Sequence, residues 1–466
     1  MSFIRKNYIY ISILILISLV LRVYNINLDD LWFDELASLW IADPTISWSE
    51  TLERNIELNI GSHLIFSIIL KYFFLLFGYD PNIARLVPLV FGVLSVPLII
   101  YLTRILDKNN SWLLVGFLIS INYYLISYSQ ELRSYSLTFF LCVLSLIFFL
   151  KILEKNKLLY NILFYLVSLI AAVNHIFIFI ILFSESLFLF FFYRGNKKIF
   201  LLINFNIFAI FFSYLLLMYD SLLVQISIEE FWIEQVKGDF FIDYYFSRFF
   251  GSKIMGLIYL STLFYLLWNK KKLLLNHSNK LFLFLLILVN SYFLPVMYGF
   301  AGTPILTDRY IIFVLISIFI LISVLIFKIE NEKTKKIILI ILITSTLINN
   351  YIEIFERKNT KPDFKKSILY IKNSNSQNLM LSDGNRISVN LVSNYIKLIN
   401  VKNDKFKFYD NLDNSSFKNI WVICYLPTTA FTCDKPLDLD DDFVRKKSVS
   451  FNLIKLEFYE LINILD

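Results

Sequence analysis

The run YIYISILILISLVLRVY at 8–24, followed by LWFDEL at 31–36, decides how the rest of the chain is interpreted. The first stretch is almost wholly apolar and long enough for a helix that crosses roughly 30 Å of hydrocarbon. It follows Arg5 and Lys6 and has no small-residue cleavage site, so we interpret it as a retained first helix and not as a secretory signal. The acidic pair Asp34-Glu35 is then expected just outside the bilayer.

The composition predicts the same class of protein for the whole chain. Of its 466 residues, 58% are hydrophobic and only 17% are charged, which is outside the range of soluble globular domains. The apolar residues gather in runs that must be helical, because backbone polar groups find no partners in lipid. The candidate spans are 8–24, 62–77, 82–103, 112–127, 134–150, 158–174, 176–193, 199–218, 252–268, 281–298, 309–327 and 337–352.

The basic residues favour a topology in which segment 62–77 does not cross. If this short run lies in the outer interface, every Lys/Arg-rich short loop falls on one side, which the positive-inside rule makes cytoplasmic. Eleven crossings then place the amino terminus inside the cell and the tail outside a cell (inner or plasma) membrane. The basic residues on the cytoplasmic side are Arg5, Lys6, Arg104, Lys108, Lys151, Lys155, Lys157, Arg194, Lys197, Lys198, Lys270, Lys271, Lys272, Lys280, Lys328, Lys333, Lys335 and Lys336. This collar accounts for most of the net charge of +7, so no nucleic-acid partner is needed.

A change to polar residues after Ile352 predicts two domains, a membrane domain at 1–352 and an extracytoplasmic domain at 353–466. In the second, Lys361-Pro362-Asp363-Phe364 predicts a helix start. Apolar runs at 378–381, 420–425 and 448–458, with a helical pattern at 387–396, indicate a small α/β domain. Cys424 and Cys433 both lie there, which leaves a disulfide open if the compartment is oxidising.

With this topology, the remaining polar residues cluster at the outer ends of the spans. The string Tyr128-Ser129-Gln130-Glu131-Leu132-Arg133-Ser134-Tyr135 forms the second outer loop, and acidic residues fill the fourth loop at 219–251. Asn174-His175 and Thr307-Asp308-Arg309-Tyr310 lie at two further outer turns. For Arg133 and Arg309 the alternative is that they only extend to lipid headgroups, and for His175 that it is simply packed. Glu185, inside a span, has no assigned role. The chain has no Gly-rich phosphate loop, zinc-site spacing or nucleophile elbow.

The order of these strings resembles a known family of membrane enzymes. Asp34-Glu35 is followed by Gly61-Ser62-His63-Leu64, then by Ala84-Arg85-Leu86-Val87-Pro88 and Phe91-Gly92, and then by the Gln130–Tyr135 string. Over about residues 1–330 this is similar to the GT-C superfamily of membrane glycosyltransferases. The branch is that of the dolichyl-phosphate-mannose–protein mannosyltransferases and aminoarabinose transferases (family 39-like).

The resemblance implies a role for each matching residue. Asp34 would be the base that deprotonates the acceptor hydroxyl, and Glu35 would assist it or organise the loop. Segment 62–77 would be the amphipathic helix below the active site. The family often has His-Pro-Pro or Lys-Pro-Pro where this chain has Ser62-His63-Leu64. A metal site at that corner is therefore in doubt: no metal ligand is assigned, no cofactor is certain, and a divalent metal stays open. The residues expected to bind the donor phosphate or the acceptor are Lys71, Glu131, Arg133, Tyr135, His175 and Arg309.

The expected reaction is transfer of a sugar from a polyprenyl-phosphate donor to a lipid, glycan or protein acceptor on the outer side, with inversion. The donor carries its own leaving group, so the enzyme must bind the phosphate with cations and remove one proton. The main alternative is a polytopic transporter or flippase of lipid-linked sugars, which would share the composition and the basic collar. A non-catalytic scaffold is a third interpretation. The acidic first loop and the folded outer domain favour the enzyme, because simple transport needs neither.

Overall fold

The computed structural model describes residues 2–59, 63–226, 233, 247–274, 280–382, 386–399, 406–408, 418–425 and 442–461. The chain divides into two compact units. Unit 1 consists of 1–24, 55–69 and 86–357, and unit 2 of 25–54, 70–85 and 358–466. The sequence predicts a second domain from residue 353 onward. Unit 2 also includes two stretches of the first outer loop, among them the one that carries Asp34 and Glu35.

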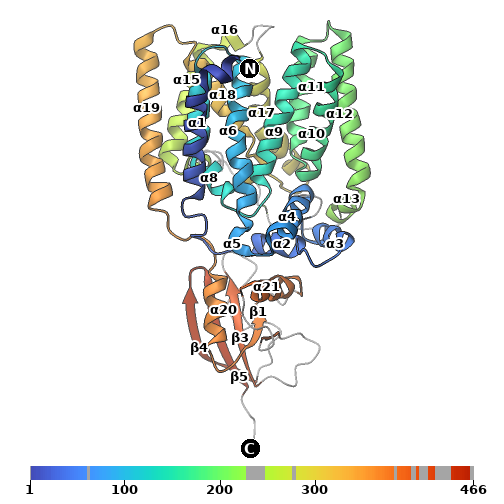
Figure 1. Ribbon diagram of the computed structural model, residues 1–466, viewed down its shortest axis with the longest axis vertical. Helices are drawn as coiled ribbons and strands as arrows, with labels where there is room; N and C mark the ends of the chain where they lie inside the picture. The colour runs from blue at the N-terminus through green and yellow to red at the C-terminus, as the bar shows by residue number, and fades with distance from the viewer. Residues whose placement is uncertain are drawn as a thin grey trace, which may run out of the picture. The chain divides into compact units, whose positions relative to one another are not determined.

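Unit 1 is a bundle of helices that run alongside one another (Figure 1). Neighbours along the chain pack together, as in the pairs α6–α7, α9–α10 and α17–α18, and α6 also packs on α9. The long helices are α1 (Ser2–Val23), α6 (Leu86–Leu106), α7 (Ser111–Ile121), α9 (Tyr135–Glu154), α10 (Leu158–Asn174), α11 (Ile178–Phe192), α12 (Lys197–Leu217), α15 (Lys253–Asn269), α17 (Leu281–Ala301), α18 (Val314–Ile326) and α19 (Glu332–Asn350). The short elements are α8 (Tyr123–Ser129), α13 (Tyr219–Ile226), α14 (Ser247–Phe250), α16 (Lys271–Leu274), η2 (Asp308–Ile311) and η3 (Tyr351–Phe355).

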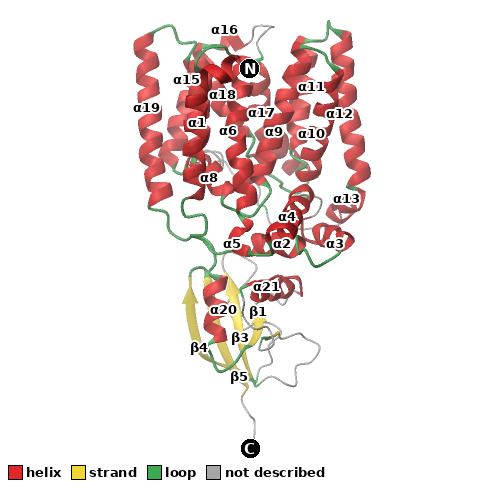
Figure 2. Cartoon of the chain, in the orientation of Figure 1, coloured by secondary structure: helices red, strands yellow, loops and turns green. Residues whose placement is uncertain are grey.

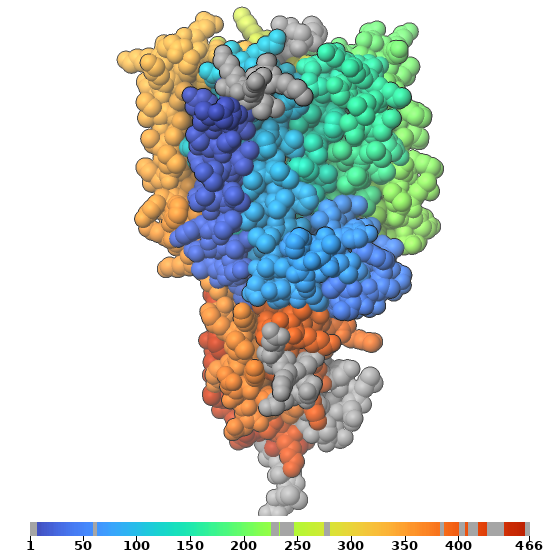
Figure 3. All heavy atoms as spheres, in the orientation of Figure 1, coloured from blue at the N-terminus to red at the C-terminus, as the bar shows by residue number. Residues whose placement is uncertain are grey.

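The helices have the length and surface of membrane spans. Five described helical segments are long and apolar enough to cross a membrane, and a sixth span results if the bent pair α7–α8 counts as one. Shorter apolar helices include α10, α11 and α18. Several helices expose large apolar side chains, for example Phe205 and Phe208 on α12 and Tyr8 and Leu16 on α1. Helix α1, in dark blue, lies on the surface of the bundle in Figure 3. Such an apolar exterior fits contact with lipid and not with water.

The span predicted at 112–127 is broken in two. Asn122 has an extended backbone (φ −61°, ψ 121°), and its side chain accepts a hydrogen bond from the Leu125 amide and so caps α8. The two helices meet at 53°. The Asn350 amide group donates to the Ile121 carbonyl at 2.6 Å, which supplies a partner at the break. The break depends on these partners from distant parts of the chain, and hydropathy could not reveal it.

Gly92 on α6 allows a close approach between helices. A Cβ atom at this position would lie 2.1 Å from the Ser129 hydroxyl and 2.9 Å from Arg22 Nε. The Arg22 side chain is 1% exposed, and it donates to Ser129 Oγ at 3.1 Å and to the Ser120 carbonyl at 3.0 Å. Two of the motifs in the sequence, Phe91-Gly92 and Ser129-Gln130, therefore meet around one buried arginine.

We expect Gly92→Ala to destabilise the purified protein by about 1–3 kcal/mol, because the methyl group overpacks this contact. The gain in helix propensity, at most ~1 kcal/mol, would not offset this cost. Thermal unfolding in detergent measures the effect. Gly195→Ala is the matched control, because a Cβ there meets nothing within 4 Å. Equal unfolding temperatures for the two variants would contradict the packing argument.

Unit 2 joins short helices to a five-stranded sheet (Figure 2). Its helices are α2 (Phe33–Ile41), α5 (Pro81–Ala84), α20 (Phe364–Lys372) and α21 (Arg386–Leu398), while α3 (Trp48–Asn59) and α4 (Leu64–Phe77) each belong partly to unit 1. The strands are β1 (Asn378–Leu381), β2 (Lys407–Phe408), β3 (Asn419–Tyr425), β4 (Phe443–Phe451) and β5 (Ile454–Leu461), in the order β2-β1-β3-β5-β4. The pairs β1–β2 and β1–β3 are parallel, and the other two are antiparallel.

The predicted α/β character of the tail is confirmed, with one correction. Helix α20 begins after Asp363 as expected, and the predicted runs at 378–381 and 420–425 lie in β1 and β3. The run 448–458 is not one strand, because the chain turns at Leu453 (φ 53°) and pairs β4 with β5 as a hairpin. Cys424 is buried in β3. Cys433 lies outside the described residues, as do most of the acidic residues of the fourth outer loop.

Candidate active site

The acidic pair of the first outer loop opens helix α2 in unit 2. Trp32 is extended (φ −94°, ψ 174°) and ends the preceding loop, and Asp34 and Glu35 lie in the first turn of the helix. Acidic residues are favoured there, because the amide groups of the first turn point toward them. The Glu35 carboxylate also accepts a hydrogen bond from the Trp32 amide at 3.4 Å. Glu35 is fully buried and Asp34 is half-buried.

Arg85 makes a two-point ion pair with Glu35. Arg85 Nε donates to Oε1 at 2.8 Å and Nη2 donates to Oε2 at 2.7 Å. The same guanidinium donates to the carbonyl oxygens of Ile26 and Asp29, at 2.9 and 2.8 Å. The arginine of the Ala84-Arg85-Leu86 string thus joins the start of the loop to the start of α2. This geometry supports a positioning role for Glu35, as the alternative to direct catalysis.

We expect Glu35→Gln to destabilise the protein by about 3 kcal/mol, because it leaves the buried Arg85 charge without its counter-charge. Urea or thermal unfolding in detergent measures this loss. The double variant Glu35→Leu/Arg85→Met should recover part of it, because apolar residues of similar size avoid the unpaired charge. A single variant as stable as the wild type would contradict a structural role for the ion pair.

Lys71 has local partners within unit 2. Its ammonium group donates to the carbonyl oxygens of Ile46 and Ser47 at 2.7 and 3.2 Å, and to Thr51 Oγ1 at 2.8 Å. It also lies 4.8 Å from the centre of the Trp48 ring. An ammonium group has three protons to donate, so these contacts account for them. Lys71 therefore joins α4 to the start of α3 and to the loop before α3, and we do not carry it forward as a substrate ligand.

A second group of predicted site residues comes together in unit 1. The Tyr135 ring lies 5.6 Å from the ring of His63 and 6.2 Å from that of His175, and the two histidine rings are 5.9 Å apart. The Arg309 guanidinium lies 6.0 Å from the centre of the Tyr135 ring. These residues come from the starts of α4 and α9, the turn after α10 and the 3-10 turn η2. Four segments distant in sequence thus build one cluster.

His63 belongs to this cluster, although the sequence analysis assigns it no role. It has a left-handed backbone (φ 70°), and its amide donates to the Asn174 carbonyl at 2.8 Å. Its Nδ1 contacts the Ser134 hydroxyl. The Gly61-Ser62-His63 corner is visible in the sequence, but its contact with His175 depends on the packing of α4 against the turn after α10.

The electrostatics of the cluster are set by its two arginines. Arg133 is 7% exposed and lies directly before α9. Burial, followed by the positive charges of Arg133 and Arg309, lowers the pKa of His175, which lies in the turn after α10, to about 3. His175 is therefore neutral at neutral pH, and the arginines supply the positive charge. Two guanidinium groups beside neutral imidazole and phenol groups are suited to bind a phosphate.

The other residues of the second outer loop have different surroundings. Gln130 Nε2 donates to the Tyr24 carbonyl at 2.7 Å, and Gln130 Oε1 accepts from Arg357 at 2.9 Å, so this side chain joins the end of α1 to the segment that follows η3. Glu131 is half-buried, and its carbonyl accepts from the Arg133 amide at 2.7 Å. Asp308, next to Arg309, is 2% exposed and lies 3.7 Å from Arg248.

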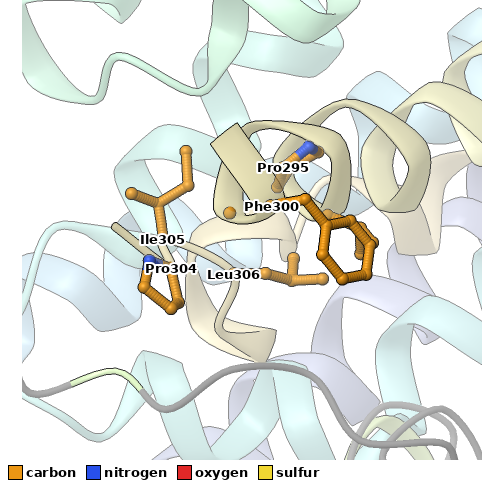
Figure 4. Close-up of a pocket in the computed structure, with 7 residues that line it drawn as sticks. Pro295, Phe300, Pro304, Ile305 and Leu306 are labelled. Carbon is orange, nitrogen blue, oxygen red and sulfur yellow. The ribbon is translucent and has the colours of Figure 1, made fainter. Parts of the chain in front are cut away.

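An apolar pocket adjoins the chain segment that leads to Arg309. Its lining comes from the end of α17 and from the stretch that follows, with Pro295, Phe300, Pro304, Ile305 and Leu306 drawn in Figure 4. Leu306 is three residues before Arg309.

The candidate carboxylates do not form a metal site in the part of the chain that the structure describes. There, no three His, Cys, Asp or Glu side chains are grouped as metal ligands. The Glu35 carboxylate is paired with the Arg85 guanidinium, and the Asp29 carboxylate accepts a hydrogen bond from the Thr360 amide at 2.7 Å. No step below therefore depends on a metal.

Sequence comparisons give no match for this chain. No family model matches it, and no curated protein does.

Comparison with solved structures shows the fold. A crystal structure of the Archaeoglobus fulgidus oligosaccharyltransferase tethered to an acceptor peptide has a TM-score of 0.56 at 11% identity. The match covers 86% of this chain and 64% of the oligosaccharyltransferase chain, so this chain spans less than two thirds of that protein. Apo ArnT from Cupriavidus metallidurans has a TM-score of 0.52 at 11% identity, with 86% of this chain and 71% of that one covered. Both are GT-C glycosyltransferases, and this chain has the same fold.

Proposed function

We propose that this chain is a membrane glycosyltransferase that moves a sugar from a polyprenyl-phosphate donor to an acceptor hydroxyl. The observation that carries the proposal is the cluster of Arg133, Arg309, Tyr135 and His175 in a GT-C fold. Among the solved neighbours, the archaeal oligosaccharyltransferase has been captured with dolichol-phosphate, and ArnT with undecaprenyl phosphate. These ligands support a lipid-phosphate donor here.

The proposed reaction is a single displacement. Asp34 takes the proton of the acceptor hydroxyl, and the acceptor oxygen forms a bond to the anomeric carbon of the donor sugar. The bond between that carbon and the phosphate oxygen breaks, and polyprenyl phosphate leaves with both bonding electrons. Arg133 and Arg309 stabilise the charge that develops on the leaving phosphate. Because the acceptor enters opposite the leaving group, the anomeric centre is inverted.

The transfer can be tested with membranes that contain the overproduced chain and radiolabelled polyprenyl-phosphate sugars. We expect the label to leave the lipid and to appear on an acceptor. A label that crosses the membrane while it remains on the lipid would favour the transporter or flippase instead. The half-buried acid at the start of α2 and the folded sheet of unit 2 favour the enzyme, because transport requires neither.

We also propose eleven crossings, with the amino terminus in the cytoplasm and the tail outside. Without α4, the apolar helices and the α7–α8 pair give this number, and all the basic short loops fall on one side. Cysteines introduced at the exposed positions Asn109 and Asn156 should react only with a membrane-permeant maleimide in intact cells. Cysteines at Ser49 and Asn373 should also react with an impermeant one. Reaction of Asn109 and Ser49 from the same side would contradict the topology.

A further inference from the structure

Unit 2 contains a polar pocket that the proposed reaction does not use. Its volume is about 310 Å³, at the lower end of the range for pockets that hold small molecules. It is lined by the loop before α2, the start of α5, the first turn of α20 and the end of α21. Asp34 is not part of the lining.

Two carboxylates of the pocket, Asp30 and Asp363, are held by hydrogen bonds. The Asp30 carboxylate accepts hydrogen bonds from the Tyr395 hydroxyl at 2.6 Å, from the Leu31 amide at 2.8 Å and from the Lys365 amide. Burial raises the pKa of Asp30, although these hydrogen bonds partly oppose the change. Asp363 accepts from Lys366 at 2.9 Å. Such preorganised acceptors are what a ligand rich in hydroxyl groups needs.

The lining carries charges of both signs, which bears on the class of ligand. The carboxylates are Asp29, Asp30 and Asp363, and the cations are Lys365 and Lys366, because the Arg85 charge is already paired with Glu35. A phosphate would meet the carboxylates, and a polyamine would meet the cations, so neither is favoured. Leu28, Pro81 and Leu398 add apolar surface that can pack against the C–H face of a sugar ring.

We propose that this pocket binds a neutral saccharide, and that the acceptor is accordingly a glycan of which one sugar unit is held here. The assignment of this saccharide to the acceptor rests on the proposed transferase function. The binding itself does not, and the two can be tested separately.

Binding is measured by saturation-transfer NMR on the full chain in detergent. The probes are the methyl glycosides of glucose, galactose and mannose, and N-acetylglucosamine, each in competition with inorganic phosphate. We expect at least one of these sugars to bind and phosphate not to displace it. Lys365→Ala and Asn27→Ala should each weaken binding about fivefold, the loss of roughly one hydrogen bond. Ile399→Trp should abolish binding by filling the pocket. Lys372→Ala is the matched control, because it removes an exposed lysine of the same helix outside the lining.

The outcomes separate the two proposals. If none of the sugars binds, or if Ile399→Trp folds with an unchanged unfolding temperature and binds as the wild type does, the saccharide pocket is refuted, whatever the transfer assay shows. Displacement of the sugar by phosphate would refute it in favour of an anion site. If Asp34→Asn keeps saccharide binding while transfer is lost, both proposals are supported. If no transfer occurs in the wild type but Ile399→Trp abolishes binding, the pocket stands and the proposed function fails.

Discussion

Asp34→Asn should reduce sugar transfer on the order of 100- to 10,000-fold, the range of general-base contributions. Asparagine has nearly the same shape as aspartate but cannot take up the proton of the acceptor hydroxyl. Both groups of the Glu35–Arg85 ion pair are unchanged in this variant, so the fold should survive. Turnover, donor binding and thermal unfolding are measured side by side on purified protein, and only turnover should change.

The comparison with Glu35→Gln makes this test specific. If Glu35 only positions the loop, its variant should lose less activity than Asp34→Asn and more stability. Glu53→Gln, on the exposed face of α3, is the control for removal of an acid from the same outer loop. Wild-type turnover in Asp34→Asn would refute the assignment of the base, and equal losses in both variants without unfolding would leave the choice between the two acids open.

Arg133→Ala and Arg309→Ala should each lower kcat/KM for the donor on the order of 100- to 1,000-fold, as expected when one group that stabilises transition-state charge is removed. Both arginines lower the pKa of His175, which places their charges near the same ring. Lysine at either position should retain part of the activity, because the charge remains while two-point contact with a phosphate is lost.

A matched control separates phosphate binding from a general effect of surface charge. Arg194, an exposed arginine in the loop after α11, belongs to the predicted basic collar. Arg194→Ala should leave donor kinetics unchanged. If Arg133→Ala and Arg309→Ala also left the donor kinetics unchanged, phosphate binding would be refuted. The alternative, in which both residues only extend to lipid headgroups, would then hold.

Much of the secondary structure could be predicted from the sequence. Each of the twelve apolar runs coincides with a helix or a helix pair in the described residues, and the strands β1 and β3 lie where turn residues bound short apolar runs. The likeness to GT-C enzymes is confirmed at the level of the fold. These features are local, because a helix in lipid needs only a sufficient length of apolar side chains.

Several features of the candidate site depended on the tertiary structure. Glu35 and Arg85 are fifty positions apart, and their ion pair exists because the fold brings the end of α5 to the first turn of α2. The sequence does not indicate a partner for Lys71, but its ammonium group donates hydrogen bonds to three oxygen atoms of a separate segment. His63 gains its place beside His175 in the same way.

The sequence by itself therefore determined which segments are helices and where the acidic pair lies along the chain. Hydropathy, charge sign and residue type are properties of each segment, and they survive without knowledge of its neighbours. Only the tertiary structure decided which polar side chains are already engaged by the protein and which are grouped around a common site. A buried charge is stable only where distant segments supply its hydrogen-bond partners, and this depends on how the whole chain packs.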